Sequence, residues 1–392
     1  MGTGMGAPSN SVEAIGHWVV QRRAARIEDP VAKLRYLRGA IDSDSGRVVR
    51  AGAKRCLHRA KVLALAGLFL LPASTISDTS RKPVLPTPTL ATGPGAALSA
   101  RIPNVWLVEE ARSYELYSNG LRIDTRYTVG NGRRPYPVYR KDTLALEGWQ
   151  TGPVGILFHT TESNIAPFEA KQNKRLRRVG RWLLEYVQKK RAYHFIIDRF
   201  GRVHRVVRET DTANHAGYSV WADAKHVYVN LNPSFIGVSF EAQSDRRANK
   251  PPITPAQAHA AKVLTEMLRS RYGIAAENCV THAQVSVYSR SMRVGNHVDW
   301  AANFPFEALG LGENYSRPNA AVAVFGFKYG PTFLKVTGGA LWKGLAFGED
   351  EFRQLAATRG VSVARYRAAR EKRYQEIIAD IEEKISSQEH GS

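Results

Sequence analysis

Three polar side chains stand where an apolar segment ends or a loop begins, and their types suit a metal ion. His159 directly follows the apolar run of residues 154–158 in "VGILFHTTES". His282 follows a short apolar stretch in "CVTHAQVS", and Asp299 lies in "GNHVDWAANFPF". Two neutral imidazoles and one carboxylate are a ligand set of catalytic zinc sites, which keep a fourth position for water. Because these residues are far apart in the sequence, their spacing alone is weak evidence.

Each of these residues also has a structural alternative. His159 could be a hydrogen-bonded histidine of the core. Asp299 could cap the N-terminus of a helix that begins in "WAANFPF". The choice between a ligand and a structural role therefore depends on the elements that position them.

The segments around these residues alternate between strand and helix patterns. The sequence predicts a hairpin at Asn119-Gly120, a helix over 254–273 capped by Thr254 and stopped by Gly273, and a strand–turn–strand unit with its turn at Phe200-Gly201. Further strands are predicted over 152–160 and 235–243, and a basic helix over 171–190. Strands with helices between them favour an α/β fold. The basic residues of 171–191 are either a solvated helix face or a patch for an anionic wall polymer.

The charge of the chain favours anionic partners. Its 392 residues include 56 Lys and Arg against 35 Asp and Glu, a formal net charge of +21. Nucleic acid, an anionic membrane face and an acidic wall polymer all fit this charge. We expect no nucleic-acid partner, because the basic residues are spread along the chain and no zinc-finger, RRM or helix-turn-helix signature occurs. Two cysteines, Cys56 and Cys279, allow at most one bridge.

The first 104 residues of the chain have the composition of an export or anchor region. Residues 1–61 are basic, and we expect them in the cytoplasm. Residues 62–77, "VLALAGLFLLPASTIS", form an apolar segment like a signal anchor or signal peptide. Its core of about 10–15 residues is short against the roughly 20 of a spanning helix, and the alternative is a buried helix of a small domain. Residues 78–104, rich in Pro, Thr and Gly, predict a linker.

The remaining chain divides into a globular domain, 105–310, and a helical extension, 311–392, of unknown role. Within the extension, 349–385 is predicted to be helical with a break at Gly360. We expect a solvated helical hairpin here. The alternative is the helical half of a LysM wall-binding module, which the stretch "LAATRGVSVARYRAA" faintly resembles.

Over about 152–309, ordered sequence blocks resemble those of a known family. The blocks are "ILFHTTES", "AYHFIIDRFGRVHRVV", "ANHAG", "NPSFIGVSFE", "TPAQAHAAKVLTEML", "THAQVS" and "DWAANFPF". They are similar to those of the zinc-dependent N-acetylmuramoyl-L-alanine amidases (amidase type 2), which share a fold with phage amidase-lysozymes and animal peptidoglycan recognition proteins. The resemblance implies a central mixed β-sheet flanked by helices. It also implies a Zn²⁺ ion held by His159, His282 and Asp299.

The resemblance also implies a reaction. Zinc-activated water would hydrolyse the amide between the muramoyl lactyl group and L-Ala of peptidoglycan. His297 stands two residues before the carboxylate ligand, where the family commonly has a Lys that stabilises the oxyanion and some members have a Thr. Ser239 stands where many bacterial members have a Glu base. Glu241, two residues on and on the same strand face, is a candidate base. The alternative for Glu241 is a surface salt bridge.

Other family positions complete the expected site. Tyr193 matches a Tyr that phage and animal members place before the hairpin histidine, and it would orient water or polarise the carbonyl; packing is the alternative. His194 and His215 are expected to be structural or to line a groove, and Asp198 to shape the turn before Gly201. Three further histidines are expected to be exposed: His204, His226 and His259.

These features predict an enzyme of the bacterial cell envelope. The lead hypothesis is an amidase acting on peptidoglycan or muropeptides, either anchored to the inner membrane through 62–77 or secreted. The alternative is a non-catalytic peptidoglycan-binding protein of the same fold. The sequence leaves the oligomeric state open.

Overall fold

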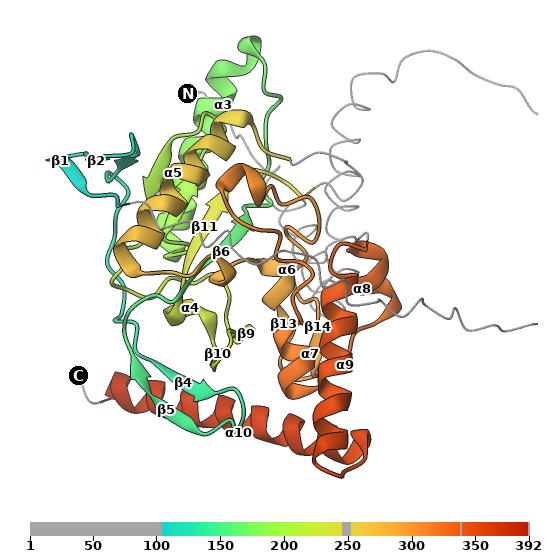
Figure 1. Cartoon of the computed structure of the whole chain (residues 1–392). Helices are drawn as coiled ribbons and strands as arrows, with labels where there is room; N and C mark the ends of the chain where they lie inside the picture. The colour runs from blue at the N-terminus through green and yellow to red at the C-terminus, as the bar shows by residue number, and fades with distance from the viewer. Residues whose placement is uncertain (1–103, 245–251, 338, 391–392) are drawn as a thin grey trace, which may run out of the picture. The chain divides into compact units, whose positions relative to one another are not determined.

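The computed structural model describes residues 104–244, 252–337 and 339–390 (Figure 1). The basic N-terminal segment, the apolar segment 62–77 and nearly all of the linker lie outside the described residues, so the predictions made for them remain predictions. Among the described helices, none combines the length and the apolar character needed to cross a membrane.

A mixed sheet of eight strands forms the centre of the domain, as the sequence predicts. Strands β7, β11, β6 and the edge strand β12 run parallel to one another, and β8 pairs with β7 antiparallel. In spatial order the strands are β1 (Leu107–Ala111), β2 (Tyr114–Tyr117), β3 (Arg122–Asp124), β8 (Val203–Arg205), β7 (Phe195–Ile197), β11 (Phe235–Phe240), β6 (Gly155–Thr160) and β12 (Cys279–Thr281).

The two faces of this sheet are covered by different helices (Figure 1). Helix α5 (Pro255–Tyr272) packs its apolar side on Phe158, Phe240 and their neighbours. Helix α3 (Asn173–Lys190) packs on the other face, against Ile196. Because side chains alternate along a strand, His159 follows Phe158 onto the face that α3 partly covers. Strands β7, β11 and β6 are therefore buried on both sides, and His159 is turned towards the α3 side.

A second, antiparallel sheet of four strands packs beside the first through Tyr136, Trp221 and Tyr228. Its strands are β5 (Leu146–Gln150), β4 (Tyr136–Arg140), β10 (His226–Val229) and β9 (Val220–Ala222). The remaining short elements are η1 (Ala170–Gln172), α4 (Leu231–Ser234), η2 (Ala276–Asn278), α6 (His282–Val285), β13 (Val287–Tyr288), β14 (Arg293–Val294) and η3 (Glu307–Leu309).

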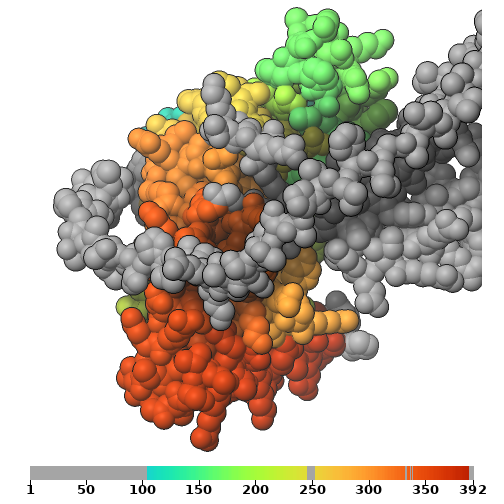
Figure 2. Space-filling view, turned by 90° about the vertical axis from the view of Figure 1, so that its right-hand side faces the viewer, coloured from blue at the N-terminus to red at the C-terminus, as the bar shows by residue number. Residues whose placement is uncertain are grey.

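The C-terminal extension consists of α7 (Ala320–Phe325), α8 (Pro331–Val336), α9 (Trp342–Thr358) and α10 (Val363–His390). The predicted break at Gly360 is confirmed, but the expectation of a solvated hairpin is wrong. Phe352 of α9 and Tyr374 of α10 are fully buried, and Tyr374 packs edge-on against Phe325 of α7. In the space-filling view these helices, in red, make up the lower part of the visible face (Figure 2).

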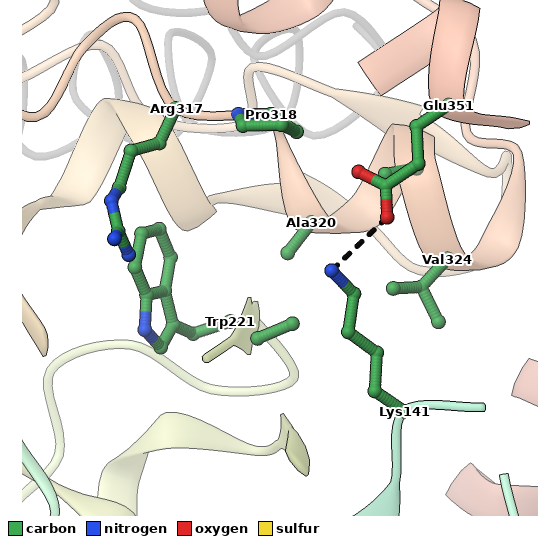
Figure 3. A pocket seen from close by; sticks show the side chains of 9 residues that line it. Lys141, Trp221, Arg317, Pro318, Ala320, Val324 and Glu351 are labelled. Atoms are coloured by element: carbon green, nitrogen blue, oxygen red, sulfur yellow. Dashed lines mark ion pairs between the residues drawn. The ribbon is translucent and has the colours of Figure 1, made fainter. Parts of the chain in front are cut away.

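The extension also contacts the four-stranded sheet. Lys141, directly after β4, forms an ion pair of 3.0 Å with Glu351 of α9 at the wall of a cavity of about 200 Å³ (Figure 3). On α10, Arg373 donates a hydrogen bond to the carbonyl of Leu144 at 3.1 Å. The helices after residue 311 are thus packed onto the domain that precedes them.

Candidate metal centre and its cavity

The sheet topology explains why His159 and His282 meet. His159 lies near the carboxyl end of β6, and His282 directly follows β12, the parallel neighbour of β6. The carboxyl ends of parallel strands lie at one edge of a sheet, which is where α/β proteins usually place their ligands. Asp299, from the loop after β14, reaches the same edge and completes a cluster whose donor atoms all lie within 4.8 Å of one another.

The donor atoms of this cluster face one another closely. Nδ1 of His159 is 3.1 Å from Nδ1 of His282 and 3.3 Å from Oδ2 of Asp299. Nδ1 of His282 is 2.9 Å from Oδ1 of Asp299. A tetrahedral zinc ion with bonds of about 2.0 Å separates its donors by about 3.3 Å. The types and separations of these three side chains therefore fit a zinc ion.

The electrostatics of the cluster suit metal ligation. Burial lowers the pKa of His159 to about 4, with a further contribution from His282, so its imidazole is neutral at pH 7. For Asp299, burial alone would raise the pKa, but the nearby His282 and His159 hold it well below its usual range. Neutral imidazoles and an ionised carboxylate are the protonation states that bind a metal.

His215 lies directly behind His159. Its Nδ1 is 3.1 Å from Nε2 of His159, and its own Nε2 is 3.3 Å from the carbonyl oxygen of Phe235. If Nδ1 of His159 faces the other donor atoms, the Nε2–H of His159 donates a hydrogen bond to Nδ1 of His215. The Nε2–H of His215 then donates to the carbonyl oxygen of Phe235. Such a chain fixes the orientation and tautomer of a ligating histidine.

The loop that carries His215 is held by side chains on both sides. Oδ1 of Asn232 accepts hydrogen bonds from the backbone N–H groups of residues 215, 216 and 217 at 2.9, 2.7 and 2.9 Å. Gly237 of β11 lies against the ring, and a Cβ there would come within 2.7 Å of it. Nδ1 of His194 accepts from the Gly237 N–H at 2.9 Å, and its Nε2–H donates to the carbonyl of Asp211 at 3.0 Å. His194 is therefore structural, and His215 lines the cavity.

Residues of the C-terminal extension hold the turn that presents His282. Gln284 closes a capping box with Thr281 and donates a hydrogen bond to the carbonyl of Asn314 at 2.9 Å. The amide of Asn314 donates to the carbonyl of Cys279 at 3.0 Å, and that of Asn319 donates to the carbonyl of Gln284 at 2.8 Å. The position of His282 thus depends on residues beyond 310.

The Asp299 loop is anchored by the residue that follows the carboxylate. Trp300 is almost fully buried and packs edge-on against Phe240 and Phe304, with ring centroids 5.4 and 5.1 Å apart. Its carbonyl accepts a hydrogen bond from the hydroxyl of Tyr315 at 2.8 Å. These contacts fix the loop behind the carboxylate.

A cavity of about 650 Å³ opens over the cluster. Tyr193 and His297 line it, as do Asn214 and Tyr218. The ring of Tyr193 lies 5.0 Å from that of His159, and its backbone has a φ of +61°. Burial and the negative charge of Asp299 raise the pKa of Tyr193, so its phenol stays protonated at neutral pH.

His297 also contacts the cluster from the cavity wall. Its ring stacks on that of His282, with centroids 4.5 Å apart and an interplanar angle of 18°. Desolvation by the surrounding protein lowers the pKa of His297, and His282 lowers it further. At neutral pH it is therefore an N–H donor without charge.

Glu241 is not among the residues that line the cavity. Its side chain is 3% exposed, and its carboxylate accepts a hydrogen bond from the backbone N–H of Arg199 at 3.1 Å. The carboxylate lies against Gly180 of α3, where a Cβ would be 3.5 Å from Oε2. Burial raises the pKa of Glu241. The structure thus places Glu241 on the same face as His159 but beneath α3.

The cavity wall contains a carboxylate that the sequence patterns did not single out. Glu162 lines the cavity, and its Oε1 accepts hydrogen bonds from the hydroxyl of Thr160 at 2.5 Å and from the backbone N–H of Ser244 at 2.7 Å. Its φ of +49° is uncommon for a residue with a side chain. The sequence offers one indication of this role, since Glu162 lies at the start of the loop that follows the strand carrying His159.

Comparison with known proteins supports the resemblance seen in the sequence. Residues 150–299 match the family model described as "N-acetylmuramoyl-L-alanine amidase", amidase type 2. All three residues of the metal cluster lie within the matched range. A search of curated proteins gives no match.

Several solved structures are similar to the chain. The amidase LysC from Clostridium intestinale is 20% identical and aligns over 48% of this chain and 93% of its own, with a TM-score of 0.26. AmiD from E. coli, solved with an anhydro-muramyl tripeptide, is 21% identical over 52% of this chain and 67% of its own, with a TM-score of 0.31. AmpDh3 from Pseudomonas aeruginosa, solved with an anhydromuramic pentapeptide, is 23% identical over 41% of this chain and 60% of its own, with a TM-score of 0.31.

Proposed function

Residues 150–299 belong to the amidase type 2 family of N-acetylmuramoyl-L-alanine amidases, and on that basis we propose a zinc-dependent peptidoglycan amidase. Its substrate is the amide between the muramoyl lactyl group and L-Ala, in peptidoglycan or in released muropeptides. The observation that carries the proposal is the convergence of His159, His282 and Asp299 within the matched residues, with donor separations of 2.9–3.3 Å.

Side chains of this chain supply the remaining parts of an amide hydrolysis. A bound zinc ion would act as a Lewis acid and lower the pKa of a water molecule. His159, His282 and Asp299 would hold it, and the hydrogen bond to His215 would keep His159 oriented. The cavity above them admits the scissile amide and leaves room for water.

Two neutral donors of the cavity wall are proposed to stabilise the charge that would develop on the carbonyl oxygen. The phenol of Tyr193 stays protonated because its pKa is raised, and it can donate a hydrogen bond to the oxyanion. His297 can donate from a neutral ring, in place of the Lys that the family commonly has. Donors fixed in position before the reaction stabilise a developing oxyanion without the cost of reorganisation.

Glu162 is the candidate proton acceptor that the cavity offers. Besides Asp299, it is the carboxylate among the described residues that line the cavity. Glu241 remains the candidate that the strand pattern predicts, but its carboxylate is covered by α3. We therefore assign the larger catalytic role to Glu162.

The family implies a cell-envelope or secreted location. Retention through the apolar segment 62–77 remains part of the proposal, with residues 78–104 as the linker to the amidase domain. Peptidoglycan is the proposed partner, and we propose no role in nucleic-acid binding.

Zinc content and amide hydrolysis, measured on one preparation of the full chain, test this proposal. We expect one zinc per chain and release from purified sacculi of stem peptides with a free L-Ala amino terminus. His159→Ala should lose both, whereas His259→Ala, an exposed change on α5, should keep both. Bound zinc and retained sacculi without release would instead support the non-catalytic binding protein. Absence of zinc from the wild-type protein would refute the ligand assignment.

A further inference from the structure

Helix α3 carries a dense row of positive charge, and no ion pair within the described part of the chain neutralises it. Five of its first nine residues are exposed cations: Lys174, Arg175, Arg177, Arg178 and Arg181. Among the described residues, none of these five forms an ion pair. The sequence of α3 contains one acidic residue, Glu185, near its other end. In Figure 2 the green region around the start of α3 protrudes at the top of the view.

This arrangement costs stability in the isolated protein. Lys174 and Arg178, like Arg177 and Arg181, are four residues apart, so like charges face each other on consecutive turns. The cations also crowd the N-terminal end of the helix, where the helix dipole favours negative charge, and the first turn contains no acid. Sequences tend to break such local rules where function requires it. An external polyanion would relieve both conflicts.

Exposed aromatic side chains continue this row towards the cavity. Trp182 and Tyr186, one turn apart, are each 59% exposed, and the guanidinium of Arg178 lies 5.4 Å from the centre of the Trp182 ring. Flat exposed rings beside cations offer apolar contact and charge to one and the same ligand. The surface formed by the five cations with Trp182 and Tyr186 is called the α3 surface below.

The C-terminal end of α3 borders the cavity over the metal cluster. Asn214 lines the cavity and holds the end of the helix through two hydrogen bonds. Its side-chain amide donates to the carbonyl of Lys190 at 3.1 Å, and its backbone N–H donates to the carbonyl of Arg191 at 2.9 Å. Two residues after Arg191 the chain reaches Tyr193, another cavity residue. The C-terminal end of α3 therefore links the helix that carries the α3 surface to the wall of the cavity.

We propose that the α3 surface binds polymeric peptidoglycan, the polymer to which the scissile amide belongs, through the carboxylates of its stem peptides. This inference rests on the proposed function. Lys174 and Tyr186, the two ends of the α3 surface, are 12 residues apart, so at about 1.5 Å of rise per residue the surface is about 18 Å long. It therefore spans several charged groups of a polymer and is too long for a single small anion. Its continuity with the cavity favours the polymeric substrate over nucleic acid or an anionic lipid surface. A strand lying along α3 would place the carboxylates of neighbouring stem peptides on the cations while one stem peptide enters the cavity.

Co-sedimentation of the full chain with purified sacculi tests this inference, with EDTA present so that no turnover occurs. The test variant changes Lys174, Arg177, Arg178 and Arg181 to Gln. The matched control changes four exposed cations elsewhere to Gln, namely Lys262, Lys343, Arg365 and Lys384, and so alters the net charge equally. Circular dichroism and thermal unfolding verify that both variants fold.

We expect wild-type binding to weaken as salt rises from 50 to 300 mM, because screening shortens the reach of exposed charges. The α3 variant should bind sacculi about tenfold more weakly than the wild type at low salt, and the control within about twofold. Equal loss in both variants, or binding independent of salt, would overturn the inference. So would tighter wild-type binding to duplex DNA or to phosphatidylglycerol vesicles than to sacculi.

Hydrolysis of a soluble muropeptide by the wild-type protein is measured separately. If the wild type binds sacculi through α3 but never releases stem peptides, the proposed function fails while the surface assignment stands. If it cleaves the soluble fragment and the α3 variant still binds sacculi like the wild type, the surface assignment fails while the proposed function stands.

Discussion

The hydroxyl of Tyr374 in α10 donates a hydrogen bond of 3.0 Å to the backbone carbonyl of Tyr218, a residue of the cavity wall. The neighbouring Gln375 donates to the carbonyl of Ser289, also in the wall, at 3.0 Å. One helix of the C-terminal extension thus holds two loops of the cavity. The extension, which lies beyond the family match, has a structural role in the proposed site.

Tyr374→Phe removes this hydrogen bond and little else. The carbonyl of Tyr218 would lose its buried donor, so we expect the free energy of unfolding to fall by about 1 kcal/mol. The KM for a soluble muropeptide should rise more than kcat falls, because the change alters the wall and not the metal cluster. Thermal unfolding and steady-state kinetics measure both effects. Tyr114→Phe, which removes a hydrogen bond at the surface of β2, is the control and should change neither.

His215→Phe keeps an aromatic ring behind His159 but removes the acceptor of its Nε2–H. Loss of such a partner typically weakens metal binding about 10–100-fold. Competition with a chromogenic chelator measures the zinc affinity without any assay of activity. His226→Phe, on β10, should leave the affinity unchanged. Equal affinities of His215→Phe and the wild type would refute the orienting role of His215.

Glu162→Gln and Glu241→Gln distinguish the two candidate proton acceptors. We expect Glu162→Gln to lower kcat by about 10²-fold or more, the usual scale of general-base catalysis, with bound zinc retained. Glu241→Gln should lower kcat by less than about tenfold, because α3 covers its carboxylate. Zinc content and kcat are measured on the same samples. The reverse order of the two effects would restore Glu241 as the base.

Asp198 makes the stability of the hairpin depend on pH. Burial alone would raise its pKa, but hydrogen bonds from His204 and Arg202 lower it below the ordinary value near 4. A lowered folded-state pKa stabilises the protein above about pH 4, and this contribution disappears as the pH falls towards the folded-state value. We expect Asp198→Asn to lose about 1–3 kcal/mol at pH 7. Denaturant unfolding should show a shallower pH dependence for this variant than for the wild type below pH 4.

Cys279 should resist thiol reagents in the folded protein. Its side chain is fully buried in β12, and burial raises its pKa to about 12. In a Cys56→Ser background, we expect labelling by a maleimide at pH 8 only after denaturant is added. Rapid labelling under native conditions would show that β12 opens readily.

Local signals in the sequence predicted much of the framework. Thr254 and Gly273 bound α5 with a capping box and a φ of +67°, and Gly120 has the positive φ of the predicted turn. Asp198 shapes its turn by accepting hydrogen bonds from the backbone N–H groups of Phe200 and Arg202. These features depend on neighbouring residues, so a single sequence displays them.

Local sequence patterns do not predict the contacts between segments that are far apart in the chain. His204 was expected to be exposed, but it is buried beside Asp198, because the hairpin packs this side of β8 inward. Asn232 and Asn314 act on backbone groups 15 or more residues away, and nothing in their local sequence indicates it. The order of sequence blocks predicts the three cluster residues. The role proposed for Glu162 follows only from the structure, in which its side chain lines the cavity.

The connection of His159 to His282 also has a consequence for the order of folding. The two rings come from positions 123 residues apart and meet only when β12 has joined the sheet beside β6. Closing so long a loop lowers the conformational entropy of the chain before the contacts between the two strands can offset this loss. A metal ion that needs both rings would therefore bind late, and its uptake during refolding would report that the parallel sheet is complete.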